Sequence, residues 1–270
     1  MKFKLSALLC FTVTLALAQK KDTLFYESFN STALNRKKWN VEVTGRTVNN
    51  EQQAYVDSSL VLKQTNGSLF ITPVSRPGYQ SKEQKKYDFP SGRINTRGKF
   101  EFTHGTASAR IKMSGGAGLW PAFWLLGEGK WPDCGEIDIM ETVGDSSWFS
   151  NALHGPGYSG DTPIHYRYSF AKGIDVTQWH IYTVEWATDH ITFRVDGKAT
   201  YNVTRNMVEK YGRWAFDNPK FVILNFALGG GYPQGVNKVN SPYPGLSQSS
   251  VNKIKANQAQ MQVDWVLVTR

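Results

Sequence analysis

Short runs of alternating or β-branched residues recur along the whole chain. They are LFYESF, SLVLKQ, SLFITPV, GKFEFTHG, ASARIKM, GEIDIME, HIYTVEW, HITFRVDG, KFVILNFAL and MQVDWVLV. Turn formers such as Asn66-Gly67 and Asp196-Gly197 separate them, at roughly the 8 to 12 residue spacing of sandwiches and barrels. This pattern predicts an all-β fold, with short helices expected only near Asn35 to Trp39 and near Thr204 to Tyr211.

The N-terminal segment has the pattern of a secretory signal peptide. Two lysines precede an apolar stretch, Leu5 to Leu17, and small residues lead to a cleavage point after Ala18. The stretch is shorter than the roughly 20 residues that a membrane-spanning helix needs. We therefore expect residues 1–18 to be removed, residues 19–270 to form a single domain, and the protein to be secreted without membrane attachment.

The remaining composition argues against a disulfide-stabilised protein and against a nucleic-acid-binding protein. Cys134 is the only cysteine outside the leader, so an intramolecular disulfide is impossible and a buried, unreactive thiol is expected. The formal charge of +9 is spread over short basic clusters that acidic or polar neighbours interrupt. Such clusters are typical of a solvated surface and do not predict a nucleic-acid partner.

Two long segments lack strand character, Gly155 to Gly173 and Gly229 to Lys255. Loops of this length in a compact domain are usually functional or disordered. The final run, Met261 to Thr269, is apolar enough to be held in a sheet, so the two chain ends are expected to meet in one domain.

The segment CGEIDIMETVG carries three carboxylates, Glu136, Asp138 and Glu141. Acids interleaved with isoleucines also occur in ordinary half-exposed strands. Here, however, no Lys or Arg lies between Lys130 and Arg167 to balance the charge, and tryptophans flank the segment on both sides. Glycines ahead of LWPAFWLLG also suggest backbone that bends or permits a close approach.

The spacing of these carboxylates is compatible with a catalytic pair only if the strand is irregular. A separation of five residues places Glu141 on the opposite face of a regular strand from Glu136. A β-bulge with Ile139 or Met140 as the extra residue would return all three acids to one face. Two carboxylates about 5 to 5.5 Å apart are what a retaining glycoside hydrolase requires. A carboxylate at Asp138 would raise the neighbouring pKa values.

The motifs GEIDIME, GLWPAFWLLG and ALHGPGY together resemble glycoside hydrolase family 16, specifically its laminarinase-like endo-β-1,3-glucanases. The resemblance implies a jelly-roll (concanavalin A-like) sandwich of two curved antiparallel sheets with a concave substrate cleft. It implies retaining hydrolysis of β-1,3 or mixed β-1,3-1,4 glucans, with Glu136 as nucleophile, Glu141 as general acid/base and Asp138 assisting. No cofactor is required for this chemistry.

The resemblance also implies further site residues. Those expected to bind the glucan are Asn50, Arg93, Trp120, Trp124, Trp131, His154, Asn225 and Tyr232. Tyr232, in GGGYPQG, stands where the family often has tryptophan, so a smaller ring is expected to stack on the sugar at that subsite. A structural calcium is expected near Glu27, Gly67 and Asp264, although no ligand motif supports it. The protein is expected to be a monomer.

Three other functions stay open from the residues alone. A glucan transglycosylase would use the same covalent intermediate, and a non-catalytic glucan-binding protein would share the fold, although here the trio of acids is intact. A metal-dependent enzyme would need a second cluster with recognisable ligand spacing, and the chain offers none.

Overall fold

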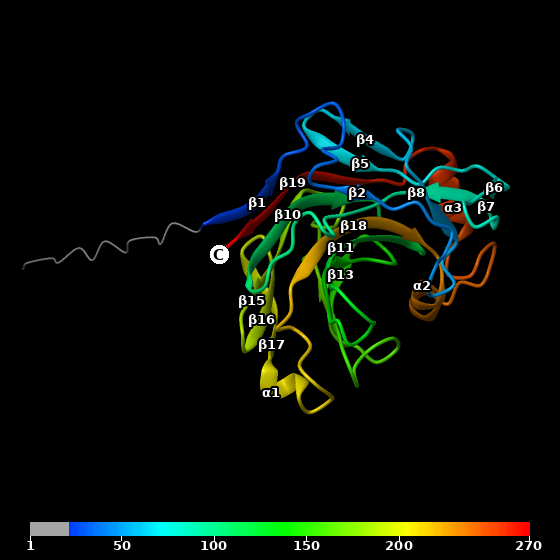
Figure 1. The fold of residues 1–270 in the computed structure, drawn as a ribbon. Coiled ribbons are helices and arrows are strands. Elements are labelled where there is room, and N and C mark those ends of the chain that lie inside the picture. Colours follow the sequence, from blue (N-terminus) through cyan, green and yellow to red (C-terminus); the bar gives the residue numbers. More distant parts are fainter. Residues whose placement is uncertain (1–21) are drawn as a thin grey trace, which may run out of the picture.

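The computed structural model describes residues 22–270. Its core is a sandwich of two antiparallel sheets, which we call the front sheet and the back sheet (Figure 1). The signal peptide expected at residues 1–18 lies outside the described residues. None of the helices in residues 22–270 is long and apolar enough to cross a membrane.

The back sheet has the strand order β17-β16-β15-β10-β19-β5-β4, and β1 also pairs with β19. Its strands are β1 (Thr23–Glu27), β4 (Leu62–Thr65), β5 (Ser68–Ile71), β10 (Gly105–Met113), β15 (His180–Trp186), β16 (His190–Val195), β17 (Lys198–Thr204) and β19 (Met261–Thr269). The pairing of Glu27 with Val266 confirms that the two ends of the described chain meet in one sheet.

The front sheet has the strand order β14-β13-β12-β11-β18-β9-β2. Its strands are β2 (Asn40–Val41), β9 (Arg93–Asn95), β11 (Leu119–Gly127), β12 (Glu136–Glu141), β13 (Trp148–His154), β14 (Ile164–Ser169) and β18 (Lys220–Leu228). Two small pairs complete the strands: β3 (Gln53–Tyr55) with β8 (Phe89–Ser91), and β6 (Tyr79–Gln80) with β7 (Lys86–Tyr87). The predicted all-β sandwich is confirmed.

The hydrophobic core lies between the two sheets. Alternate residues of the front strands, such as Ile137 and Val222, are fully buried together with back-strand residues such as Ala107, Val184 and Val266. Because successive strand residues point to opposite faces, the neighbours of these core residues lie on the other face of the front sheet. We call this the site face.

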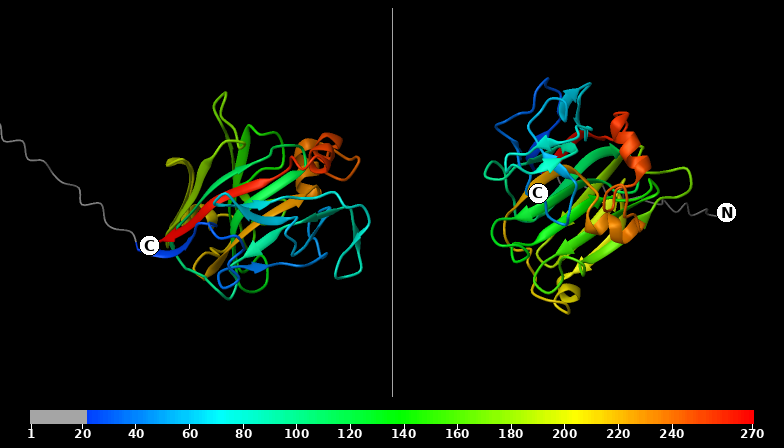
Figure 2. Two further views of the ribbon diagram at one scale, coloured as in Figure 1. Left: turned by 90° about the horizontal axis from the view of Figure 1, so that it is seen from above. Right: turned by 90° about the vertical axis from the view of Figure 1, so that its right-hand side faces the viewer.

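The helices are α1 (Arg205–Val208), α2 (Gly231–Asn237) and α3 (Gln248–Lys255). The first confirms the helix expected near Thr204. Helices α2 and α3 lie at the end of the sandwich opposite the C-terminus and the start of β1 (Figure 2). They correct the expectation that Gly229 to Lys255 is loop alone.

Three further expectations were wrong. Residues Asn35 to Trp39 form a single turn, because the Asn35 carbonyl accepts from the amides of Lys38 and Trp39 and the chain then enters β2. The run GKFEFTHG forms only an isolated bridge at Phe102, and its phenylalanines pack on other aromatic rings instead of lining a strand. The segment Gly155 to Gly173 contains β14, an edge strand whose exposed polar residues hide its pattern.

The glycines before β11 permit a close approach of backbone, as expected. Gly118 has φ +88°, and a Cβ built there would lie 2.1 Å from the Gly245 carbonyl oxygen. Only glycine therefore allows the chain after α2 to pack against the start of β11, and this packing sets α2 beside the site face.

Candidate active site

Strand β12 contains the predicted bulge. In its register with β11, Met140 pairs with Phe123 and Asp138 pairs with Trp124, so Ile139 has no partner. In its register with β13, Asp138 pairs with Ala152 and Glu141 with Ser150. Two residues, Ile139 and Met140, therefore lie opposite one, Asn151, and the prediction of a bulge at this point is confirmed.

The bulge resets the alternation of the strand. Ile137, Ile139 and Met140 are all buried in the core, although the last two are adjacent in sequence. Glu136, Asp138 and Glu141 lie away from that core, Asp138 almost fully enclosed and the two glutamates partly accessible. The odd spacing in the sequence is thus compatible with one shared face.

Indole N–H groups bind both glutamates. Trp120 Nε1 donates to Glu141 Oε1 at 2.8 Å, and Trp131 Nε1 donates to Glu136 Oε2 at 2.9 Å. Trp120 is nearly buried on β11, whereas Trp131, in the turn before β12, is 44% exposed. The indoles orient the two carboxylates, and Trp131 also presents an exposed ring beside them.

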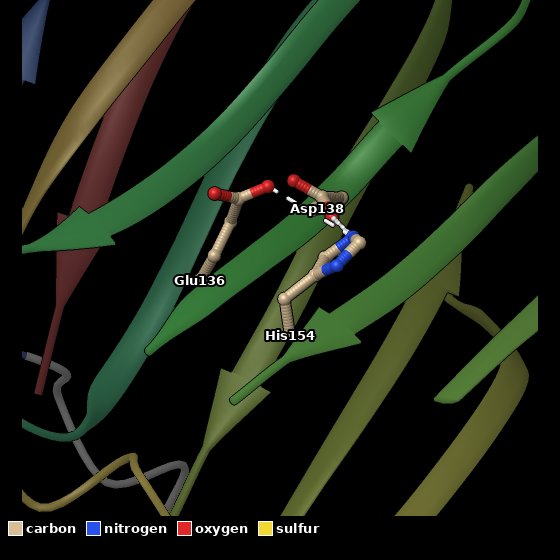
Figure 3. Close-up of side chains that lie close together, drawn as sticks. All are labelled: Glu136, Asp138 and His154. Carbon is tan, nitrogen blue, oxygen red and sulfur yellow. Dashed lines mark ion pairs between the residues drawn. The ribbon is translucent and has the colours of Figure 1, made fainter. Parts of the chain in front are cut away.

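His154 on β13 faces the same carboxylates. Its Nε2 lies 3.2 Å from Asp138 Oδ2 and 3.9 Å from Glu136 Oε1. Figure 3 shows the three side chains turned toward one another. Within residues 22–270, Glu136, Asp138 and His154 are the one group of acidic, histidine or cysteine side chains close enough to hold a metal ion together. This group shares Glu136 and Asp138 with the carboxylate trio, so it does not form a second, separate centre.

The surroundings of the trio raise the pKa of all three carboxyls. Removal from water, and then the charge of Asp138, raise the pKa of Glu136 to about 8 and that of Glu141 to about 8. Burial also raises the pKa of Asp138. Because each ionisation opposes the next, the three carboxyls titrate as one system.

The two glutamates differ in which neighbours oppose this increase. His154, the Trp131 N–H and Arg93 all lower the pKa of Glu136, whose only acidic neighbour of weight is Asp138. Glu141 has two acidic neighbours, Asp138 and Glu136, against Trp120 and His154. The two carboxyls thus have different neighbours, although the pKa of each is raised to about 8.

A second polar group lies next to the trio on the site face. Trp124 pairs with Asp138 across β11 and β12, and its Nε1 donates to Asn225 Oδ1 at 2.7 Å. Asn225 in turn donates to the hydroxyl of Tyr55 at 3.1 Å. The Arg93 guanidinium lies 4.9 Å from the Trp124 ring and is paired with Glu42. The buried amide of Asn225 thus has the partners that its position requires.

The start of α2 borders the trio from the other side. The Tyr232 ring meets Trp120 edge to face at 5.4 Å, and the Tyr232 and Ser150 hydroxyls lie 3.2 Å apart. The loop that contains Asn50 packs here through its backbone, because Gly231 N donates to the Asn49 carbonyl at 2.6 Å. The side chain of Asn50 is exposed, and no described contact joins it to the carboxylates.

The positions expected to bind calcium lie in a different region, on β1, β19 and the β4–β5 turn. Glu27 is buried and one of its oxygens has no hydrogen-bond partner, although Lys38 Nζ is 3.6 Å away. Asp264 is paired with Arg110 at 2.5 Å, and Gly67 can offer only its carbonyl. Glu27 thus offers a buried oxygen without a hydrogen-bond partner, and calcium at this set of residues stays a prediction that no step of the chemistry involves.

The turn before Glu136 is held by a buried lysine that the sequence analysis did not single out. Lys220 Nζ donates to the carbonyls of Cys134 at 2.9 Å, Gly135 at 3.2 Å and Ala215 at 3.1 Å, and to Asn218 Oδ1 at 3.1 Å. Cys134 is buried and free, as predicted, and burial raises the pKa of its thiol.

Tyr55, Ser150 and Asn151 were also not anticipated. The order of the strands in the sheet brings these residues next to β12 or β18. No motif or spacing in the sequence indicates that they lie there. Their one available signal is a polar side chain next to apolar neighbours in a strand, which requires a partner but does not identify it.

Comparison with known proteins agrees with this geometry. The sequence pattern of glycosyl hydrolases family 16 matches residues 35–266. Glucan endo-1,3-beta-glucosidase A1 of Niallia circulans is 31% identical over 91% of this chain, which spans 37% of that protein's length. The beta-glucanase of Rhodothermus marinus is 29% identical, with 87% of this chain and 79% of that protein covered.

A solved structure shares the fold. The laminarinase catalytic domain of Thermotoga maritima superposes with a TM-score of 0.79 at 32% identity, covering 93% of this chain and 99% of that one. This similarity confirms the predicted jelly-roll sandwich. With the family pattern spanning most of the described residues, the chain belongs to glycosyl hydrolases family 16.

Proposed function

We propose that this chain is an endo-β-1,3-glucanase that hydrolyses its substrate with retention, and that it also accepts mixed β-1,3-1,4 glucans. The observation that carries the proposal is the bulge in β12, which gathers three carboxylates on one face between two indole donors. Family membership and the glucanase activity named for the relatives support it.

Two steps would follow from this arrangement. In the first, the ionised carboxylate of Glu136 attacks the anomeric carbon while Glu141 gives its proton to the departing glycosidic oxygen, leaving a covalent glycosyl ester. In the second, Glu141 takes a proton from water, and the resulting nucleophile displaces Glu136 from the sugar. The anomeric carbon therefore keeps its configuration, and both glutamates return to their starting protonation states.

The division of roles follows from the family resemblance, and the neighbours of the two glutamates are compatible with it. Glu136 has three neighbours that favour its charged form, as a nucleophile needs. Glu141 has two acidic neighbours that favour its protonated form, as a general acid needs. Asp138 contributes the negative charge that separates the two, and His154 would hold Asp138 in place.

The exposed ring of Trp131 and the Trp120–Tyr232 pair are proposed to receive sugar rings on either side of the trio. Arg93, Trp124 and Asn225 would position hydroxyl groups through their shared network. Asn50 is proposed to act at the margin of this surface.

We further propose that the protein acts outside the cell as a monomer and that its chemistry requires no cofactor. The leader-like N-terminus supports secretion. Identification of the mature N-terminus by mass spectrometry, with a chain still beginning at Met1 as the contrary result, tests this.

The assigned roles are tested with Glu136→Gln and Glu141→Gln on laminarin, lichenan, agarose and xyloglucan. Each variant should lose nearly all hydrolysis of laminarin while keeping the wild-type circular dichroism. Glu128→Gln, which disturbs only an exposed ion pair with Arg97, is the matched control. Azide should rescue Glu136→Ala and give a product of inverted configuration. Near-normal activity of either glutamine variant would refute the roles.

A further inference from the structure

A buried amide lies directly opposite the bulge, on the core side of the front sheet. Asn151 of β13 is fully buried. Its Nδ2 donates to the carbonyl of Ile139 at 2.6 Å, and its Oδ1 accepts from the hydroxyl of Thr200 at 3.1 Å. Thr200 belongs to β17, so the amide joins the bulge to the back sheet.

The hydrogen bond to Ile139 compensates for the irregularity of the strand. Ile139 is unpaired in the registers of β12 with both β11 and β13. A buried carbonyl left without a donor costs about 1 to 3 kcal/mol. By supplying that donor, Asn151 favours the bulged arrangement over a regular strand in which Glu141 would face the core.

The Ile139 carbonyl, which can only accept, fixes which end of the amide meets the bulge, and the Thr200 hydroxyl supplies the matching donor at the other end. A hydroxyl that donates to Oδ1 leaves Nδ2 directed at the carbonyl of Ile139, whereas a flipped amide would set two oxygens against each other. Asn151 of the front sheet and Thr200 of the back sheet therefore act together to hold the carbonyl of the extra residue, Ile139, in place.

Glu141 depends on the bulge more than Glu136 does. Glu136 precedes it and is paired with Leu126 and His154 in the regular part of the ladder. Glu141 follows it by two residues, so any shift at Ile139 moves its carboxylate relative to the rest of the trio.

We propose that Asn151, oriented by Thr200, is a positioning residue for the general acid Glu141. It touches no carboxylate itself and acts through the backbone of Ile139. This inference rests on the proposed function, and it predicts a defect confined to proton donation to the leaving oxygen.

Two substrates separate that defect from a general loss of structure. The leaving group of a laminari-oligosaccharide is a sugar alkoxide, a poor leaving group that needs the proton from Glu141. The leaving group of a 2,4-dinitrophenyl β-laminaribioside is dinitrophenolate, which departs without one. The kinetic parameter to compare is kcat/KM, because it reports steps only as far as glycosylation. Asn151→Ala should lose about tenfold or more on the oligosaccharide and little on the aryl glycoside.

Three further variants sharpen the test. Asn151→Leu keeps a similar volume but removes the Nδ2 donor, and should behave like Asn151→Ala. Thr200→Val should show the same selective loss to a smaller extent, and it keeps the proposal testable if the Asn151 variants do not fold. Thr192→Val removes a comparable bond, to Asn202 on the neighbouring strand, and should leave both substrates unaffected.

The outcomes are distinct. Equal losses on both substrates, or no loss on either, in folded Asn151 or Thr200 variants would overturn the positioning role while leaving the glucanase assignment intact. A wild-type protein inactive on both substrates would overturn the proposed function and this inference with it.

Discussion

Replacing Lys220 by methionine should change how the stability of the fold depends on pH. Burial lowers the pKa of Lys220 from 10.5 to about 7, against opposing effects from Cys134, Glu136 and Asp217. The unfolded chain therefore holds this proton more tightly than the folded chain, and between these two pKa values unfolding takes up a proton. The free energy of unfolding contributed by Lys220 consequently rises with pH, by about 3 kcal/mol between pH 7 and 9.5.

The measurement is urea unfolding at both pH values for the wild type, Lys220→Met and Lys253→Met. The wild type should gain about 3 kcal/mol relative to Lys220→Met between pH 7 and 9.5. Other groups titrate in the same window in all three proteins, so the comparison rests on the difference in slope. Lys253 is a half-buried lysine that donates to the Gly115 carbonyl at 2.7 Å, and its variant should follow the wild type.

Parallel curves for the wild type and Lys220→Met would refute the reasoning. They would mean that the oxygens around Nζ compensate fully for its removal from water, and that the lysine stays charged in the fold throughout this pH range. A dependence in Lys253→Met as shallow as that in Lys220→Met would be equally damaging.

The remaining predictions concern activity. The value of kcat/KM on laminarin should fall above about pH 8, because Glu141 then loses its proton. Burial and the charge of Asp138 raise the pKa of Glu141 to about 8. A flat profile to pH 10 would contradict this. Trp120→Phe removes a hydrogen bond that favours ionised Glu141, so the alkaline limb should move to higher pH, and a shift to lower pH would count against the geometry. EDTA should leave kcat unchanged in enzyme that stays folded by circular dichroism, because two carboxylates carry the chemistry; a loss without unfolding would contradict it.

The bulge was predictable because it left two marks on the sequence. The carboxylates have an odd spacing, and Ile139 and Met140 are adjacent apolar residues where a regular strand would alternate. The three carboxylates can lie on one face of the strand only if an extra residue stands between Asp138 and Glu141. The pairing with β11 identifies it as Ile139, a choice that depends on neighbouring strands and is absent from the segment itself.

Several elements around the site could not be predicted by the same reasoning. Strand β11 is central but contains Pro121, which normally argues against a central strand. It is tolerated here because the pairing with β12 begins only at Ala122. Strand β13 is buried on both faces along nearly its whole length, so it shows no alternation. Helix α2 begins with Gly231 and includes Pro233, residues that usually indicate a loop.

Polar partners inside the sandwich were equally hidden. Asn225 was correctly expected to need partners, but Trp124 and Tyr55 are separated from it by long stretches of sequence. The contacts of Lys220 and Asn151 likewise arise from the order of the strands. In each case the chemistry of the side chain requires a partner, and only the topology decides which one it meets.

The indole contacts described for the trio have an optical consequence. Trp120 and Trp131 each share a hydrogen bond with one of the two glutamates. Indole emission is sensitive to a charge developing at its N–H, so the contribution of these two indoles to the fluorescence should change as each carboxyl ionises. Single Trp→Phe replacements would assign the two signals, and the order of proton loss could then be followed in the resting protein, with no sugar bound and no turnover.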